Sequence, residues 1–129
     1  DHFILSWEVD NQIDLSSISL PSMIVQIPVE NAIKHALRDK DGAKRLCVSL
    51  TNKINGVGIT IQDNGAGFYP ETLSKKGTGT GLKVIYQTIQ LLNAKNVEQI
   101  GFSISNINNN ETSGTCVDIF IPKNFSYVL

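Results

Sequence analysis

The chain lacks several features that would assign it to a class. Its 11 basic and 12 acidic residues leave a formal charge of −1, which gives no electrostatic basis for binding nucleic acid or an anionic membrane. No apolar run approaches the roughly 20 residues that span a bilayer, and no signal-peptide pattern opens the chain. The two cysteines, Cys47 and Cys116, lie in separate strand-like runs. This placement favours packed, reduced thiols over a disulfide or a metal pair, and therefore a cytosolic location.

The remaining composition suits one folded domain over residues 1–129. Hydrophobic residues make up 41% of the chain and charged residues 18%, which is enough apolar material for a single core. The chain opens inside a strand-like run and has no initiating methionine. We therefore expect one domain that is a piece of a longer protein.

Alternation of apolar and polar residues, together with β-formers, predicts five strands. They cover residues 2–9, 45–50, 57–62, 99–105 and 115–121. The dipeptide Asn55-Gly56 predicts a hairpin between the second and third strands, through a loop over residues 52–56.

Helical spacing predicts two helices. The first starts near Leu20 and ends before Gly42, with a kink expected from Pro28, and the second runs from about Leu82 to Asn93. The order β, α, β, β, α, β, β predicts an α+β protein. We expect a two-layer α/β sandwich with a mixed, mostly antiparallel sheet and helices covering one face.

The first helix carries the first chemical pattern. At about 100° per residue, its core-facing stripe contains Val29, Ala32, Ile33, Ala36 and Leu37. The other side presents Asn31, Lys34 and His35, with Glu30 at its edge. These side chains could hold a phosphate-bearing ligand and a metal, although polar residues opposite a buried stripe more often form a plain solvated face.

Two glycine clusters carry the other patterns. Asp63 ends a strand just before Gly65 and Gly67, where a carboxylate could accept a hydrogen bond from an exocyclic amine such as that of adenine. A simple turn is the alternative. The run Gly77-Thr78-Gly79-Thr80-Gly81-Leu82 offers free N–H groups at a helix N-terminus to an anion, although a flexible loop is again the alternative. This run is neither a Walker A motif nor a Rossmann fingerprint.

The order of the three patterns resembles the N, G1 and G2 boxes of the GHKL, or Bergerat-fold, ATPases. That superfamily contains gyrase, Hsp90, histidine kinases and MutL. Residues 114–122, which start with Gly114-Thr115, resemble the last strand of the histidine kinase domain. Residues 20–26 leading into residues 29–35 resemble sensor histidine kinases of the LytS/YesM type. The resemblance covers nearly the whole chain and implies a catalytic ATP-binding (HATPase_c) domain with the Bergerat fold.

The resemblance also implies a role for individual residues. Asn31 corresponds to the catalytic asparagine that ligates Mg²⁺, Lys34 to a lysine that contacts phosphate, and His35 to the position against the base or ribose. Asp63 corresponds to the aspartate that reads adenine. The other implied nucleotide contacts are Gly65, Gly67, Gly77, Gly79, Gly81, Leu82 and Thr115. Residues 68–76 correspond to the ATP lid, in which Lys75 or Lys76 either reaches a phosphate or is solvated.

One position departs from the family pattern. Many relatives carry a glutamate or asparagine one turn before the N-box asparagine, and this chain has Ile27 there, which cannot act as a base. Glu30 lies next to Asn31 instead. Two roles remain equally open for Glu30: polarising the attacking group, or holding Lys34 in place through an i, i+4 ion pair.

The implied reaction is transfer of the γ-phosphoryl group of Mg²⁺-ATP to a histidine, followed by relay to a response regulator. Neither His2 nor His35 lies in an acceptor-like context, so the acceptor is expected on a separate dimerisation domain of a homodimeric, membrane-bound sensor whose cytoplasmic part contains this domain. Two rivals are a GHKL ATPase of the gyrase or MutL sort, and a degenerate module that binds only nucleotide or a partner. Ile27 argues against the first, and the intact Asn31 and Asp63 argue against the second.

Overall fold

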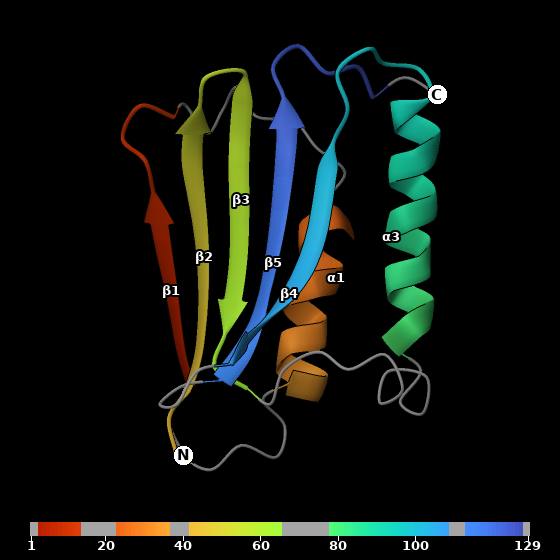
Figure 1. The fold of residues 1–129 in the computed structure, drawn as a ribbon. Helices are drawn as coiled ribbons and strands as arrows, with labels where there is room; N and C mark the ends of the chain where they lie inside the picture. The colour runs from red at the N-terminus through yellow and green to blue at the C-terminus, as the bar shows by residue number, and fades with distance from the viewer. Residues whose placement is uncertain (1–2, 14–22, 37–41, 66–77, 109–112, 128–129) are drawn as a thin grey trace.

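The computed structural model describes residues 3–13, 23–36, 42–65, 78–108 and 113–127. Within them lies one mixed sheet, whose strands are β1 (Phe3–Val9), β2 (Lys44–Lys53), β3 (Gly56–Asp63), β4 (Gly101–Asn108) and β5 (Ser113–Pro122). The strand order across the sheet is β1-β2-β3-β5-β4 (Figure 1). The strand β1 pairs in parallel with β2, and every other pairing is antiparallel. The predicted α+β class and the mostly antiparallel sheet are confirmed.

The described helices are α1 (Met23–Asn31), which continues into a π-helical turn, η2 (Ala32–Ala36), and α3 (Thr78–Asn93). They form a second layer on one face of the sheet, with α1 passing behind β5 and β4 in the view of Figure 1. The helix α1 packs beside α3, and η2 contacts β5. No helix among the described residues is long and apolar enough to cross a membrane.

The core lies between the sheet and the two helices. Because strand side chains alternate between faces, β2 contributes Leu46 and Val48 to this layer, and β3 contributes Ile59 and Ile61, all of them buried. The predicted stripe of α3 is confirmed, since its members are buried: Leu82, Ile85, Ile89 and Leu92. The opposite face of the sheet is polar and open to solvent, as at Gln62 and Asp118 of the neighbouring strands.

The first helix differs from its prediction. Ile33 was expected in the core stripe, but its side chain is 47% exposed, whereas Ala32 is buried. The reason is the π turn, whose i→i+5 hydrogen bonds wind the chain less per residue than the α-helix assumed in the prediction. Positions after Asn31 therefore point in directions that α-helical spacing does not give. Ala36 was another predicted member of this stripe, and its side chain lies outside the described part, as does Leu37.

Two further boundaries differ. The hairpin is tighter than predicted, because Lys53 pairs directly with Gly56 and leaves only Ile54 and Asn55 in the turn. A Cβ atom at Gly56 would overlap the carbonyl group of Ile121 on β5, so this glycine permits the close approach of two strands. The helix α3 begins at Thr78 rather than near Leu82, which places Gly79 and Gly81 within its first turn.

Candidate functional site

The elements that carry the predicted site residues reach one end of the sheet, the lower end in Figure 1. The strand β3 ends there at Asp63 and β5 begins there, and the C-terminal end of α1 and the N-terminal end of α3 point the same way. Antiparallel pairing brings the end of β3 beside the start of β5.

Asp63 is the most constrained of these residues. Its side chain is only 6% exposed, and its Oδ1 accepts hydrogen bonds from the backbone N–H groups of Gly65, at 2.9 Å, and Thr115, at 3.2 Å. Burial raises the pKa of Asp63 above its usual 3.8, and the two N–H donors counteract only part of this rise. The carboxyl group is thus fixed through one oxygen at the end of β3.

Asn64 fixes the turn that follows. Its Oδ1 accepts a hydrogen bond from the backbone N–H of Arg45 at 2.8 Å, and its Nδ2 donates to the carbonyl of Ala43 at 3.0 Å. The backbone N–H of Asn64 also donates to the carbonyl of Arg45 at 3.2 Å. These three bonds attach the turn after β3 to the start of β2. No short pattern in the sequence indicates this role of Asn64.

The start of β5 is pressed against the same turn. The hydroxyl of Ser113 donates to the carbonyl of Gly65 at 2.8 Å. A Cβ atom on Gly114 would overlap the backbone carbonyl of Asp63 and crowd the Cα of Asn64, so only glycine allows this approach. The Gly-Thr pair at positions 114 and 115 was a signal in the sequence, and the resemblance implied that Thr115 assists Asp63 through a water. The direct hydrogen bond from the backbone N–H of Thr115 to Asp63 could not be inferred from it.

Glu30 and Lys34 form an exposed pair at the end of α1. Lys34 Nζ lies 3.9 Å from Glu30 Oε2, and the two side chains are 66% and 44% exposed. Glu30 Oε1 also accepts a hydrogen bond from Gln26 Nε2 at 2.9 Å. An exposed i, i+4 pair is worth only about 0.3–0.5 kcal/mol, so either side chain can leave it at little cost. Ile27 packs against the core, which agrees with its inability to act as a base.

The other predicted residues are placed to different degrees. Asn31 is partly exposed at the last position of α1, Leu82 is buried in α3, and Thr115 is buried with its backbone N–H on Asp63. His35 lies in the π turn, Gly79 and Gly81 lie in the first turn of α3, and for these three only the backbone is described. Gly67, Gly77 and the lid segment 68–76 lie outside the described residues.

The described side chains offer few ligands for a metal ion. The described residues contain no group of three or more histidine, cysteine, aspartate or glutamate side chains that could hold a metal by themselves. The amide oxygen of Asn31 is a hard ligand of the type Mg²⁺ accepts. Mg²⁺ commonly takes one or two protein oxygens and completes its shell with phosphates and water, so a single side-chain ligand fits a nucleotide-bound ion.

Comparison with known proteins identifies the class. A profile of the family described as histidine kinase-, DNA gyrase B- and HSP90-like ATPases matches residues 18–124. This match covers most of the chain, including both glycine clusters and all the elements around Asp63. The chain therefore belongs to that ATPase family.

Within the family, the chain is similar to LytS sensor proteins. It is 32% identical over 130 residues to the Sensor protein LytS of Staphylococcus epidermidis, covering 95% of this chain and 21% of that protein. It is 30% identical over 96 residues to the Sensor protein LytS of Streptococcus mutans, covering 67% of this chain and 17% of that protein. The chain thus spans about a fifth of the length of these relatives.

Solved structures share the fold. The histidine kinase domain of the blue-light activated histidine kinase from Erythrobacter litoralis matches with a TM-score of 0.66 at 17% identity, covering 93% of this chain and 51% of that one. The nucleotide-free catalytic domain of histidine kinase ThkA matches with a TM-score of 0.57 at 14% identity, covering 94% and 78%. At these identities the likeness concerns the fold alone.

Proposed function

We propose that this chain is the catalytic ATP-binding domain of a sensor histidine kinase of the LytS type. In this proposal it binds Mg²⁺-ATP and supplies the γ-phosphoryl group to a histidine on a separate dimerisation domain, for relay to a response regulator. The dimerisation domain belongs to the same longer protein, which is a homodimer. The chain acts at the cytoplasmic side of a membrane-bound sensor and binds no nucleic acid.

The roles follow from the chemistry of each side chain. The free oxygen of Asp63, Oδ2, accepts a hydrogen bond from the exocyclic amine of adenine, because Oδ1 is already held by two N–H groups. Asn31 supplies one oxygen to Mg²⁺, which screens the phosphate charge when bound. Lys34 leaves its weak pair with Glu30 to contact a phosphate. The remaining proposed contacts are His35, Gly65, Gly67, Gly77, Gly79, Gly81, Leu82 and Thr115.

Phosphoryl transfer requires mainly that the protein position the reacting groups and neutralise the charge on the phosphates. The bond between the γ-phosphorus and the bridging oxygen breaks, a bond from phosphorus to an imidazole nitrogen of the acceptor forms, and ADP leaves. The imidazole proton passes to a base. Glu30 is the nearest carboxylate to Asn31 along α1 and is our candidate for that base, a role that competes with its ion pair with Lys34.

One observation supports the proposal above the others. A buried carboxyl group, held through one oxygen by two backbone N–H groups, stands where the end of β3 lies beside the start of β5, at the end of the sheet toward which the C-terminal end of α1 and the N-terminal end of α3 also point. Burial raises the pKa of this carboxyl group, and its second oxygen has no hydrogen bond of its own to the two N–H groups that hold the first. A buried carboxyl group with one oxygen available suits a residue that reads a polar ligand.

Calorimetric titration with a non-hydrolysable ATP analogue tests the binding part. The wild-type chain should bind the analogue more tightly with Mg²⁺ than without it, and Asn31→Ala should abolish that difference. Gln87→Ala is the matched control, because Gln87 is exposed on α3. If Asn31→Ala keeps the full response to Mg²⁺, Asn31 is not the ligand. If the wild-type chain binds no nucleotide at all, the module binds only a partner and the proposal fails.

Radiolabelling tests where the acceptor lies. The 129-residue chain incubated with [γ-³²P]ATP should acquire no acid-labile phosphate, because neither of its histidines is assigned as the acceptor. Acid-labile ³²P-phosphate on His2 or His35 would contradict the assignment of the acceptor to a separate domain.

A further inference from the structure

A cavity lies at the opposite end of the sheet from Asp63. It has a volume of about 850 Å³, opens to solvent, and is bordered by the turn after β1, the β2–β3 hairpin, the end of β5 and the segment over residues 123–127. We propose that this cavity binds a small organic anion with a flat apolar body, as a second ligand site remote from the proposed nucleotide site. Its volume is within the range of about 300–1,000 Å³ that is usual for small-molecule sites.

The cavity has fixed walls. The chain after β5 is attached to the hairpin by the N–H of Lys123, which donates to the carbonyl of Asn55 at 2.8 Å. It turns at Asn124, whose φ of 63° is left-handed, a conformation that asparagine tolerates better than most residues. Asn96 then holds Ser126 through two hydrogen bonds, of 2.9 Å to its carbonyl and 3.0 Å from its N–H.

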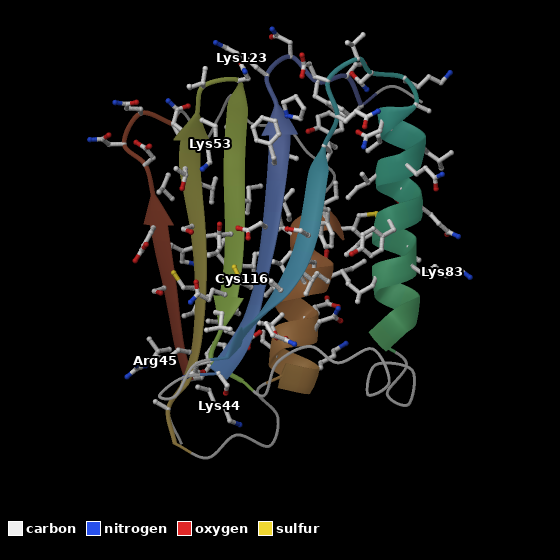
Figure 2. The ribbon with its side chains drawn as sticks, in the orientation of Figure 1. Lys44, Arg45, Lys53, Lys83, Cys116 and Lys123 are labelled. Carbon is white, nitrogen blue, oxygen red and sulfur yellow. The ribbon has the colours of Figure 1, made fainter. Side chains whose placement is uncertain are left out.

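The cavity lining is positively charged. Lys53 and Lys123 line it, both exposed at this end of the sheet (Figure 2), and none of the lining residues in the described part of the chain is acidic. Neither lysine forms an ion pair with a carboxylate among the described residues. Among the described residues, the carboxylate of Asp10 lies beside the lining, because it accepts hydrogen bonds from the backbone N–H groups of two lining residues, Gln12 at 3.0 Å and Asn52 at 3.3 Å. The two lysines outnumber this one carboxylate among the described residues, so the local charge favours an anion.

The rest of the lining suits a flat apolar group. The rings of Phe125 and Tyr127 lie 5.1 Å apart, and Val57, Ile121 and Pro122 complete the apolar surface. The hydroxyl of Tyr127 is buried without a hydrogen-bond partner among the described residues, so it is a donor with no acceptor. Apolar walls with a few polar groups are the usual composition of a small-molecule site.

The cavity is well separated from Asp63. Gly56, which lines it, begins β3, and Asp63 ends the same strand. Seven residue steps at about 3.3 Å each place the two ends about 23 Å apart, so one small ligand cannot reach both. The proposal therefore stands independently of the proposed nucleotide chemistry.

The test uses ¹⁵N-labelled chain titrated with 2-naphthoate, with the neutral 2-naphthamide as the matched ligand. Naphthoate should shift amide signals of residues 52–57 and 123–127 and leave those of Gly65 and Thr115 unchanged. The double variant Lys53→Gln with Lys123→Gln should weaken its binding by about fivefold or more, the scale of exposed charge contacts. Lys83→Gln, on the exposed side of α3 (Figure 2), should leave binding unchanged.

Three outcomes would overturn the proposal. They are the absence of shifts around the cavity at millimolar naphthoate, equal affinity for naphthamide, and shifts centred on Gly65 and Thr115, which would place the ligand in the nucleotide site. Equal loss of affinity in Lys83→Gln would likewise show that overall charge, rather than the cavity, attracts the anion. Both lysines of the double variant are exposed, so its folded spectrum can be verified directly before the titration.

Discussion

Asp63→Asn should separate nucleotide recognition from the architecture of the turn. Asparagine retains an oxygen that can accept the hydrogen bonds from the N–H groups of Gly65 and Thr115. Its other terminal atom becomes an NH₂ group, which would face the adenine amine donor to donor. The variant should therefore fold as the wild type does and lose nucleotide affinity.

The magnitude of the affinity loss follows from the lost bond. A hydrogen bond to a charged acceptor contributes about 1.5–3 kcal/mol, which corresponds to a rise in Kd of about 10- to 150-fold. Asp63→Ala should lose affinity as well, but it also leaves two buried N–H groups unpaired. Each unpaired donor costs about 1–3 kcal/mol, so Asp63→Ala should lose about 2–6 kcal/mol of unfolding free energy.

The difference in unfolding free energy between Asp63→Asn and the wild type should also depend on pH. Burial raises the pKa of Asp63 above its usual 3.8, so the folded state binds this proton more tightly than the unfolded state does. The stability associated with the protonated carboxyl is fully present below pH 3.8 and is lost as the pH rises through the folded pKa. Asparagine cannot ionise, so Asp63→Asn should gain stability relative to wild type as the pH increases across this window.

Two measurements test these predictions for the Asp63 variants. Urea denaturation from acid to neutral pH gives the unfolding free energies, and calorimetry with an ATP analogue gives the affinities. The reasoning is refuted if Asp63→Asn is as unstable as Asp63→Ala, because Oδ1 would then need its charge to hold the turn. It is equally refuted if Asp63→Asn binds nucleotide as tightly as the wild type.

The remaining predictions concern the start of β5 and the open face of the sheet. Gly114→Ala should lower the unfolding free energy measured by urea denaturation by about 1–3 kcal/mol and weaken nucleotide binding, because its Cβ would overlap the backbone of the turn. Gly101→Ala is the control: its Cβ would make only ordinary contacts, so the unfolding free energy should change by about 0.5 kcal/mol or less. Burial, and then the neighbouring Asp118, raise the pKa of Cys116 to about 11 from 9.0. In a Cys47→Ser background, iodoacetamide at pH 8 should therefore meet roughly a hundredfold less thiolate than an ordinary cysteine offers, and Asp118→Asn should speed the reaction. Fast alkylation that Asp118→Asn leaves unchanged would contradict this reasoning.

Much of the fold could be predicted because its signals are local. The stripe of α3 repeats at helical spacing, and the alternation in β2, β3 and β5 repeats every second residue. The β2–β3 hairpin could be predicted because Asn55-Gly56 is a local turn signal, although Ile54 and Asn55 form the turn itself. The family could be recognised for the same reason, since each of its boxes is a short contiguous pattern.

The π turn could not be predicted from those signals. Its i→i+5 bonds at residues 32–36 break the regular spacing on which the helical prediction depended, which is why Ile33 was wrongly expected in the core. A helix of this kind depends on local bonding and packing around it, and periodicity does not reveal it.

The sequence by itself therefore determined the class of fold, the family and the identity of the chemical groups, because these depend on residue types at short spacings. Only the tertiary structure decided that Thr115 holds Asp63, that Asn64 ties the turn to β2, and that Gly114 must lack a side chain. Those partners lie tens of residues apart in the chain. They meet because strand pairing sets their register, and no short pattern in the sequence records that pairing.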